Sequence, residues 1–387
     1  MRSGQGRPQA GARSRYPPIV AGRRGKSRRQ VLGAVGAVSA GALVVGVVGR
    51  GATPHRDTID RRGPDGPLPF LTPTAQFYKF TNSNWPSPLH PSEAQLSVGG
   101  PTSSRTVPWA ELLSLPTRRL VRTLSCDGNG YLGETPPRHL GCQMGATPDP
   151  EESSDHPEPE LWSWRYGGIG TAEWDVMTIP DLFAALSMPL TGSHLRIEGR
   201  DGYLRWFPIE RTRGDELLIA VGMNGTALPH KHGAPARLLA SGQYGAMSVK
   251  WLRAISVGSR TGARPFDGGS REDFEVKPIA FASGPIDGGS VPRGSVQLVG
   301  AAYSGRQAVK QVLVGPSGED PVVATLLDPG RPYVWSRWSA EVQLHQPGDV
   351  VVQIACSDSG GRYSTVQSPW GDAQGFGGLH RLHLTVT

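Results

Sequence analysis

The pattern of hydrophobic positions divides the chain into two parts with different periods. Over residues 68–257 apolar stretches of mixed period alternate with polar ones, which is typical of an α+β domain. Residues 179–186 predict a short helix. Residues 195–197 and 217–220 predict short strands around it. We therefore expect the first folded domain to be α+β.

After residue 275 the pattern changes to strict alternation of apolar and polar positions. Val350, Val352, Ile354 and Cys356 would form one face of a strand, and Leu382, Leu384 and Val386 the face of another. Turn sequences such as Asp-Pro-Gly and Pro-Gly-Asp separate these stretches. About 110 residues of short strands have the size of an immunoglobulin-like sandwich, so residues 276–387 are predicted to form one.

Regions rich in glycine and proline separate these parts. Residues 51–67 and 258–275 are predicted linkers, and residues 142–160 are a Pro/Glu/Ser-rich insertion expected to form a surface loop. The chain has 52 Gly and 35 Pro among 387 residues, well above their usual share of about 12%. This composition disfavours a helical bundle and favours strands joined by many turns.

The positive charge is concentrated at the N-terminus. The formal net charge is +7, yet residues 1–50 hold nine Arg, one Lys and no acidic residue. The rest of the chain is therefore mildly acidic, which argues against a nucleic-acid partner.

Residues 1–50 have the pattern of a targeting segment. The pair Arg28-Arg29 precedes an uncharged Ala/Gly/Val stretch over residues 31–49. A twin-arginine pair ahead of a moderately apolar stretch is typical of proteins exported in the folded state. We expect an extracytoplasmic protein, in which residues 31–49 are either removed or retained as a membrane anchor. Proteins that acquire a bulky cofactor before export often use this route.

The three cysteines give an odd number and no paired motif. Cys126, Cys142 and Cys356 form neither C-x-x-C nor C-x-x-C-H, so covalent haem and zinc-ribbon sites are absent. Cys126 lies between an apolar run and a glycine-rich turn, where an exposed thiolate could bind a soft metal. A buried structural thiol and a Cys126–Cys142 disulfide are the alternatives.

Polar and glycine residues are dense between residues 201 and 251. Arginine and lysine bind phosphate, aspartate and asparagine pair with ring heteroatoms, and glycine admits a close backbone approach. Such a set suits a heteroaromatic ligand that carries one phosphate.

These segments, taken in order, resemble the sulfite oxidase family. The motifs are Cys-x-Gly-Asn at 126–129, Trp-Arg-Tyr-Gly-Gly-Ile-Gly at 164–170, Ala-Glu-Trp at 172–174, Met-Asn-Gly at 223–225, His-Gly-x-Pro-x-Arg at 232–237, Ser-Val-Lys-Trp at 248–251 and Tyr-Val-Trp-Ser-Arg-Trp at 333–338. The resemblance implies a molybdenum-cofactor domain over about residues 70–257. It also implies that residues 276–387 are a dimerisation domain.

The resemblance also implies roles for individual residues. Cys126 would be the thiolate ligand of molybdenum and the catalytic residue, beside a pyranopterin (molybdopterin) cofactor. The other implied cofactor-binding residues are Phe77, Tyr78, Asp201, His232, Arg237, Ser248 and Lys250. The implied activity is oxygen-atom transfer on a small sulfur compound. Electrons would pass to a separate carrier such as a cytochrome c, and the protein would be a homodimer.

Several positions depart from the family pattern. Gly130 and Tyr131, the run Phe80-Thr81-Asn82, Phe274 and Gln374 stand where the family has anion-binding or neighbouring polar residues. Because a buried oxyanion without cationic partners is costly, sulfite itself is an uncertain substrate. Arg118, Arg119 and Arg122 could supply positive charge, although a solvated face is their ordinary interpretation.

Three other functions remain open from the sequence. A sulfoxide-type reductase fits the Phe-Tyr-x-Phe segment at 77–80 and the exported N-terminus. A non-catalytic cofactor-binding or cell-surface relative fits the departures. His230 and His232 resemble a zinc-binding pair, which would indicate a zinc hydrolase.

Overall fold

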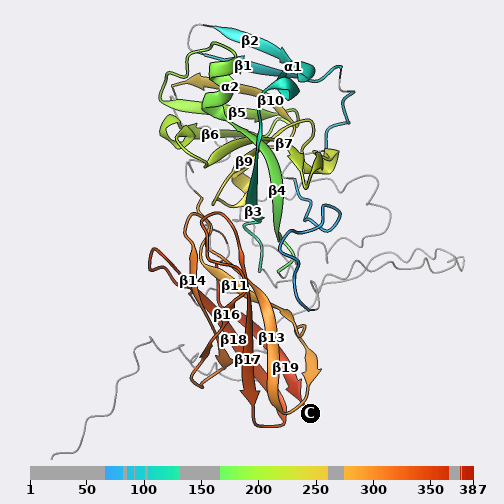
Figure 1. Ribbon diagram of the computed structural model, residues 1–387, viewed down its shortest axis with the longest axis vertical. Helices are drawn as coiled ribbons and strands as arrows, with labels where there is room; N and C mark the ends of the chain where they lie inside the picture. The colour runs from blue at the N-terminus through green and yellow to red at the C-terminus, as the bar shows by residue number, and fades with distance from the viewer. Residues whose placement is uncertain are drawn as a thin grey trace, which may run out of the picture.

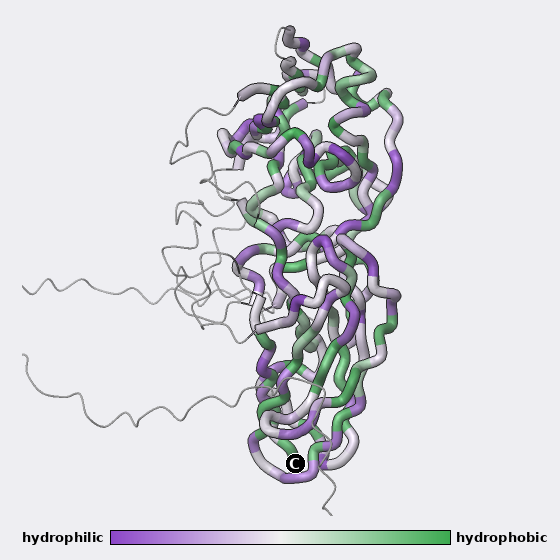
Figure 2. The backbone as a smooth tube through the Cα atoms, turned by 90° about the vertical axis from the view of Figure 1, so that its left-hand side faces the viewer, coloured by the Kyte–Doolittle hydropathy of each residue, from purple (hydrophilic) through white to green (hydrophobic). Residues whose placement is uncertain are grey.

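The computed structural model describes residues 66–81, 85–90, 92–100, 103–130, 166–259, 274–365, 375 and 377–387. Two bodies lie end to end along the long axis of the molecule (Figure 1), and the same arrangement is visible after a 90° turn (Figure 2). The N-terminal segment 1–50 and the insertion 142–160 lie outside the described residues. Among those described, no helix is both long and apolar enough to span a bilayer.

The N-terminal body contains two sheets and two short helices. One sheet has the order β2 (Ser104–Pro108), β1 (Gln95–Gly99), β10 (Leu252–Gly258), β5 (His194–Gly199) and β6 (Leu204–Pro208). The other has the order β3 (Arg118–Ser125), β4 (Ile169–Thr178), β7 (Leu217–Met223) and β8 (Thr226–Ala227), with β9 (Arg237–Ala240) also paired to β7. The helices are α1 (Trp109–Ser114) and α2 (Ile179–Ala185), and the 3-10 turns are η2 (Ile209–Thr212), η3 (His230–His232) and η4 (Gly245–Met247).

The sequence explains where these elements begin and end. The predicted helix is α2, which begins after Thr178, whose hydroxyl accepts a hydrogen bond from the Asp181 amide. A threonine cap followed by proline in the first turn is a typical helix start. The predicted strands at 195–197 and 217–220 lie in β5 and β7, and every residue of β7 is buried. A strand buried on both faces explains its nearly continuous apolar sequence.

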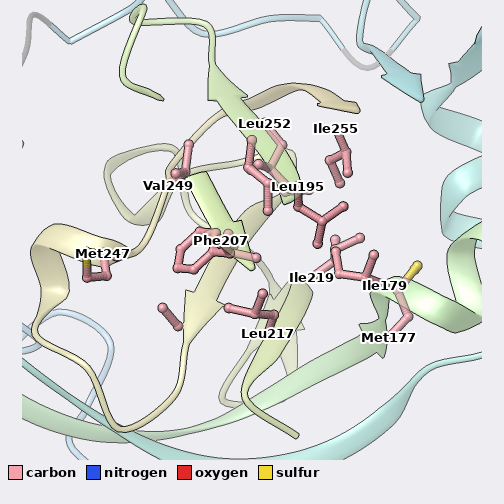
Figure 3. Close-up of a cluster of buried hydrophobic side chains, with 14 of the residues drawn as sticks. Met177, Ile179, Leu195, Phe207, Leu217, Ile219, Met247, Val249, Leu252 and Ile255 are labelled. Atoms are coloured by element: carbon pink, nitrogen blue, oxygen red, sulfur yellow. The ribbon is translucent and has the colours of Figure 1, made fainter. Parts of the chain in front are cut away.

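A large hydrophobic core fills the space between the two sheets of this body. Figure 3 shows side chains from β5, β7, β10 and the segment after η4 meeting there. Leu195, Phe207, Leu217, Ile219 and Ile255 are fully buried. Burial of such side chains contributes on the order of 1.5–3 kcal/mol each, so the core gives the adjoining loops a rigid support.

The C-terminal body is a β-sandwich. One sheet has the order β11 (Ile279–Gly284), β13 (Gly294–Tyr303), β17 (Ser336–Leu344) and β16 (Thr325–Leu326). The other has the order β12 (Gly289–Val291), β19 (His380–Val386), β18 (Gly348–Asp358), β14 (Val309–Pro316) and β15 (Val322–Val323). In β19 buried and exposed residues alternate without exception, as its sequence predicts.

The fold class predicted from the sequence is confirmed: an α+β body is followed by a β-sandwich. Cys356 lies in the sandwich core, and Trp174 and Trp251 lie in the core of the first body. Cys126 and Cys356 are free thiols, while Cys142 lies outside the described residues. One expectation was partly wrong, because Arg118 and Arg119 are exposed but Arg122 is buried. The Arg122 guanidinium lies 5.0 Å from the centre of the Tyr333 ring of the sandwich.

Candidate functional site

A pocket that is partly open to solvent lies in the first body at the carboxyl end of β3. Its walls are Phe77, Tyr78, Phe80, Thr81, Leu124, Cys126, Asp127, Asp201, Tyr203, Arg237, Gly245, Ala246, Ser248 and Lys250.

Cys126 occupies the first position after β3. Its amide donates a 2.7 Å hydrogen bond to the Gly168 carbonyl, and its carbonyl accepts one of 3.1 Å from the Asn129 amide. The side chain is 4% exposed, and its sulfur lies 3.5 Å from a carboxylate oxygen of Asp127. The backbone on both sides of the thiol is therefore fixed, and the thiol itself reaches the pocket.

Two polar residues are brought to the pocket by alternation along one extended segment. Met247 and Val249 point into the hydrophobic core (Figure 3). The alternate residues Ser248 and Lys250 line the pocket. Lys250 Nζ donates to the carbonyls of Phe80 (2.8 Å) and Lys231 (2.9 Å). Burial, and next the nearby Arg237 charge, lower the pKa of Lys250 well below its ordinary value.

Arg237 is a second cation in this pocket and, unlike the half-buried Lys250, it is buried. Its side chain is held by a 3.0 Å hydrogen bond from Nη1 to the His232 carbonyl, and its guanidinium lies 5.4 Å from the Trp174 ring centre. Burial lowers the pKa of Arg237 to about 10, so it remains charged near neutral pH. Within the described residues neither Arg237 nor Lys250 forms a salt bridge with an acidic side chain.

His232 lies beside the pocket in η3. Its Nε2 lies 3.2 Å from the Thr74 carbonyl and therefore carries the proton. Burial, and then the charges of Arg237 and Lys250, lower its pKa to about 3. The ring is thus neutral, and Nδ1 is a buried acceptor without a partner in the described structure.

Aromatic side chains also line the pocket. The rings of Phe77 and Tyr78 are stacked at 5.4 Å, and Phe77 also meets Trp174 edge-on at 5.9 Å. Glycine is needed at two contacts, because a Cβ at Gly170 would lie 2.8 Å from the Phe77 ring and one at Gly245 would lie 2.7 Å from the Tyr78 hydroxyl. Burial, and next the Cys126 and Asp127 charges, raise the pKa of Tyr78, so its hydroxyl stays protonated.

Asp201 closes the pocket near Lys250. Its Oδ1 accepts a 3.1 Å hydrogen bond from the Tyr203 amide, which fixes the carboxylate at a tight turn. Tyr203 in turn donates to the Ala246 carbonyl at 2.7 Å, and the Arg205 guanidinium lies 4.3 Å over its ring.

Several buried polar atoms around the pocket have no partner within the described structure. They are Arg237 Nε, His232 Nδ1 and both amide atoms of Asn129, in the turn after Cys126. An unpaired buried polar group costs about 1–3 kcal/mol, so a ligand that pairs with these atoms would recover that energy. A ligand with a soft metal, ring heteroatoms and an anionic group matches this donor set. The residues therefore fit a molybdenum–pyranopterin with its phosphate.

Seven of the eight residues implied by the sequence line one pocket. The eighth, His232, is joined to it through Arg237. Five lining residues were not predicted from the sequence, and only their position next to named motif residues could have indicated them: Leu124, Asp127, Tyr203, Gly245 and Ala246. Phe80 and Thr81 also line the pocket, whereas Phe274 packs on Tyr244 at 4.8 Å.

The zinc pair predicted as an alternative has a different geometry. His230 and His232 lie on a 3-10 turn, and the His230 ring packs 5.8 Å from that of Trp251. Within the described residues no group of three or more His, Cys, Asp or Glu side chains could hold a metal.

Known proteins similar to this chain include molybdopterin-binding oxidoreductases. Residues 83–265 match the family model for the oxidoreductase molybdopterin-binding domain. The chain is 29% identical over 328 residues to sulfite oxidase of Gallus gallus, covering 75% of this chain and 67% of that protein. It is 27% identical over 361 residues to the mitochondrial sulfite oxidase of Homo sapiens, covering 82% and 62%. The chain thus spans about two thirds of the length of these relatives.

A solved structure shows the same fold. The sulfane dehydrogenase SoxCD from Paracoccus pantotrophus superposes with a TM-score of 0.59 at 20% identity, covering 77% of each chain. The predicted sulfite-oxidase-type architecture is therefore confirmed. The chain is therefore similar to sulfite oxidases over most of its length, and the molybdopterin-binding family model implies a molybdenum–molybdopterin cofactor.

Proposed function

From a molybdopterin-binding domain similar to those of sulfite oxidases, we propose that this protein is an oxidoreductase acting on a small sulfur compound. The observation that carries the proposal is the pocket itself. A thiol at a fixed strand end, Cys126, shares it with the buried Arg237 and the half-buried Lys250, and neither of these two side chains forms a salt bridge among the described residues. Such an arrangement is expected where a metal and an anionic cofactor bind together.

Each residue would bind the part of the cofactor that suits its chemistry. The Cys126 thiolate would ligate molybdenum, and Arg237, Ser248 and Lys250 would bind the phosphate. Asp201 and His232 would pair with the pterin heteroatoms. When bound, the cofactor supplies two-electron redox chemistry coupled to oxygen-atom transfer.

The chain's own residues would orient substrate and control protons. The stacked rings of Phe77 and Tyr78 narrow the pocket and exclude water from one wall. The neutral Tyr78 hydroxyl can donate a hydrogen bond to an oxygen of the bound substrate across the physiological pH range. Neutral His232 can only accept at Nδ1, so it recognises a donor on the cofactor rather than an anion.

The sulfur substrate is proposed from the relatives, which include sulfite oxidases and a sulfane dehydrogenase. Phe80 and Thr81, both uncharged, line the described part of the pocket. This favours a sulfur compound of lower charge than sulfite, because a buried divalent anion requires cationic partners beyond those that hold the cofactor. Sulfoxides belong to the same range of candidates.

The cellular setting is proposed from the sequence. Residues 1–50 would direct the folded, cofactor-loaded protein through the twin-arginine route, with residues 31–49 as a cleaved signal or an anchor. Electrons would pass to or from a separate carrier such as a cytochrome c. The sandwich would pair two copies of the chain.

Metal analysis of the natively produced protein tests the function. We expect about one molybdenum and one pterin per chain, and steady turnover of at least one of sulfite, thiosulfate or a sulfoxide. Cys126→Ser is expected to remove turnover, by a factor of at least about 10³, while the circular dichroism spectrum is unchanged. A folded wild-type chain with neither molybdenum nor pterin would refute the proposal. Retained cofactor without any turnover would indicate a non-catalytic relative.

A further inference from the structure

The strand that leads to Cys126 is an edge strand. In its sheet β3 pairs along its whole length with β4, and no other named strand lies beyond it. Edge strands present backbone groups that need partners when they are buried. Here the partners near the end of β3 come from the sandwich.

Thr123, three residues before Cys126, has all of its polar groups engaged. Its amide donates to the Tyr333 carbonyl at 2.9 Å, and its carbonyl accepts from the Tyr303 hydroxyl at 3.2 Å. Its hydroxyl accepts from the Trp335 amide at 2.9 Å and lies 2.5 Å from the Thr171 hydroxyl on β4. Three of these four bonds join the strand to the sandwich, and the side chain is 1% exposed.

The sandwich side of this contact is itself held in an unusual conformation. Tyr333 has φ +66°, in the left-handed region that bulky residues rarely adopt. Its amide donates to the Gly305 carbonyl at 2.9 Å, and its ring lies 5.0 Å from the Arg122 guanidinium of β3. Backbone conformations of this kind persist where surrounding contacts fix them. In this case they direct the Tyr333 carbonyl to the Thr123 amide.

We propose that the sandwich positions the thiol of Cys126 and that Thr123 is the residue through which it acts. The role of Cys126 as metal ligand rests on the proposed function, whereas the fixing of β3 by hydrogen bonds from the sandwich does not. Removing the bonds to Thr123 would let the end of β3 open locally. The sulfur would then lose its fixed place relative to the cations of the pocket.

Thiol reactivity in the cofactor-free full-length chain tests the positioning directly. Thr123→Val keeps the shape of the side chain and removes its hydroxyl. We expect the alkylation rate of Cys126 by iodoacetamide, followed by peptide mass spectrometry, to rise by at least about tenfold, because the two hydrogen bonds of the Thr123 hydroxyl are lost. Thr123→Ser should restore the wild-type rate.

Thr178→Val is the matched control. It makes the same chemical change in the same body and removes the cap of α2, whose hydroxyl bond to the Asp181 amide is 3.1 Å. A comparable stability loss at the other end of β4, away from Cys126, should leave the Cys126 rate within about twofold of wild type. Tyr303→Phe removes a single bond from the sandwich side and should raise the rate by about threefold.

The cofactor-loaded protein gives the second readout. Thr123→Val is expected to alter the electron paramagnetic resonance spectrum of the molybdenum, while Thr178→Val leaves it as in wild type. Equal alkylation rates in Thr123→Val, Tyr303→Phe and Thr178→Val would overturn the positioning role, even if the wild type holds molybdenum. If Thr123→Val does not fold, Tyr303→Phe and Thr123→Ser decide the question by the same measurement.

Discussion

Arg237 in the pocket is buried, and Arg337 in the sandwich is half-buried. Arg337 is paired with an acidic side chain, whereas Arg237 has no acidic partner among the described residues. Arg337 donates to both carboxylate oxygens of Asp328, at 2.8 and 2.9 Å. These hydrogen bonds raise the pKa of Arg337. They also outweigh the effect of burial and lower the pKa of Asp328. Within the described residues the Arg237 guanidinium contacts the His232 carbonyl and the Trp174 ring and forms no salt bridge, and burial lowers its pKa to about 10.

This difference indicates that Arg337 has a structural role, whereas Arg237 is placed to bind an anionic ligand. A protein rarely buries a charge without pairing it, because the desolvation cost is several kcal/mol. The pair in the sandwich is complete within the fold. The charge of Arg237 would be paired by an anionic group of a bound ligand. The unpartnered His232 Nδ1 beside it would accept a hydrogen bond from a donor on that ligand.

Replacement of Arg237 should give the largest effect, and the quantity that changes should be the cofactor content of the folded chain. We expect Arg237→Met to lower the molybdenum and phosphate content per folded chain by at least about tenfold, since a charge-assisted bond contributes about 1.5–3 kcal/mol. In the cofactor-free chain the same change should leave the free energy of unfolding within about 1 kcal/mol of wild type or raise it, because a buried charge is removed. Metal analysis and urea unfolding measure the two quantities.

Arg237→Lys is the control for charge alone. It keeps the cation but loses the planar fork, so we expect cofactor content between those of wild type and Arg237→Met. Wild-type molybdenum content in Arg237→Met would show that this guanidinium does not bind the cofactor, and the comparison with Arg337 would then fail.

Replacement of Arg337 should have the reverse outcome. Arg337→Met leaves the Asp328 carboxylate without its partner and also removes a 3.1 Å bond to the Leu68 carbonyl. Since this pair is partly exposed, we expect the free energy of unfolding to fall by about 2 kcal/mol, below the cost of breaking a fully buried pair. Molybdenum content per folded chain should be unchanged.

The double variant Arg337→Met/Asp328→Asn separates the pair from the rest of the contact. It removes both charges together, so part of the lost stability should return. A double variant as unstable as the sum of the two single variants would mean that the two side chains act independently.

Much of this site could be predicted from the sequence, because its residues occur in short motifs. Periodicity predicted some strands in each body and the helix after Thr178. The resemblance implied that Cys126, Arg237 and Lys250 bind one ligand, and in the structure all three line one pocket. The alternation of Met247 and Val249 with Ser248 and Lys250 explains why a local pattern was sufficient.

Contacts between the two bodies could not be predicted in this way. Arg122 looked like one of three solvated arginines, because strand periodicity carries no information about a second domain packed on the strand edge. It is buried against Tyr333, more than 200 residues later in the chain. Thr123 carries no motif at all, and its role depends on Tyr303 and Trp335 from the sandwich.

Two buried histidines, one beside the pocket and one in the sandwich, should give the smallest effect, a pH dependence of the free energy of unfolding. Burial is the main cause that lowers the pKa of both His232 and His380 to about 3, and the Ala282 amide donates to His380 Nδ1 at 3.0 Å. Both rings are therefore neutral in the folded chain, whereas in the unfolded chain they bind protons below about pH 6.5. As the pH falls from about 6.5 towards 3, the free energy of unfolding should decrease by about 1.4 kcal/mol per pH unit for each histidine.

The cofactor should distinguish the two histidines. A bound phosphate near His232 would offset the effect of Arg237 and Lys250 and raise the pKa of His232, so its share of the pH dependence should shrink in the loaded protein. The share of His380, which packs on Tyr166 at 4.2 Å, should be the same with and without cofactor. His380→Gln keeps an acceptor for the Ala282 amide and should reduce the slope of both forms by about one proton. Urea unfolding between pH 4.5 and 8 measures these slopes. Equal slopes for loaded and cofactor-free wild type would mean that His232 is unaffected by the ligand, and that the pocket and the sandwich hold their neutral histidines for the same structural reason.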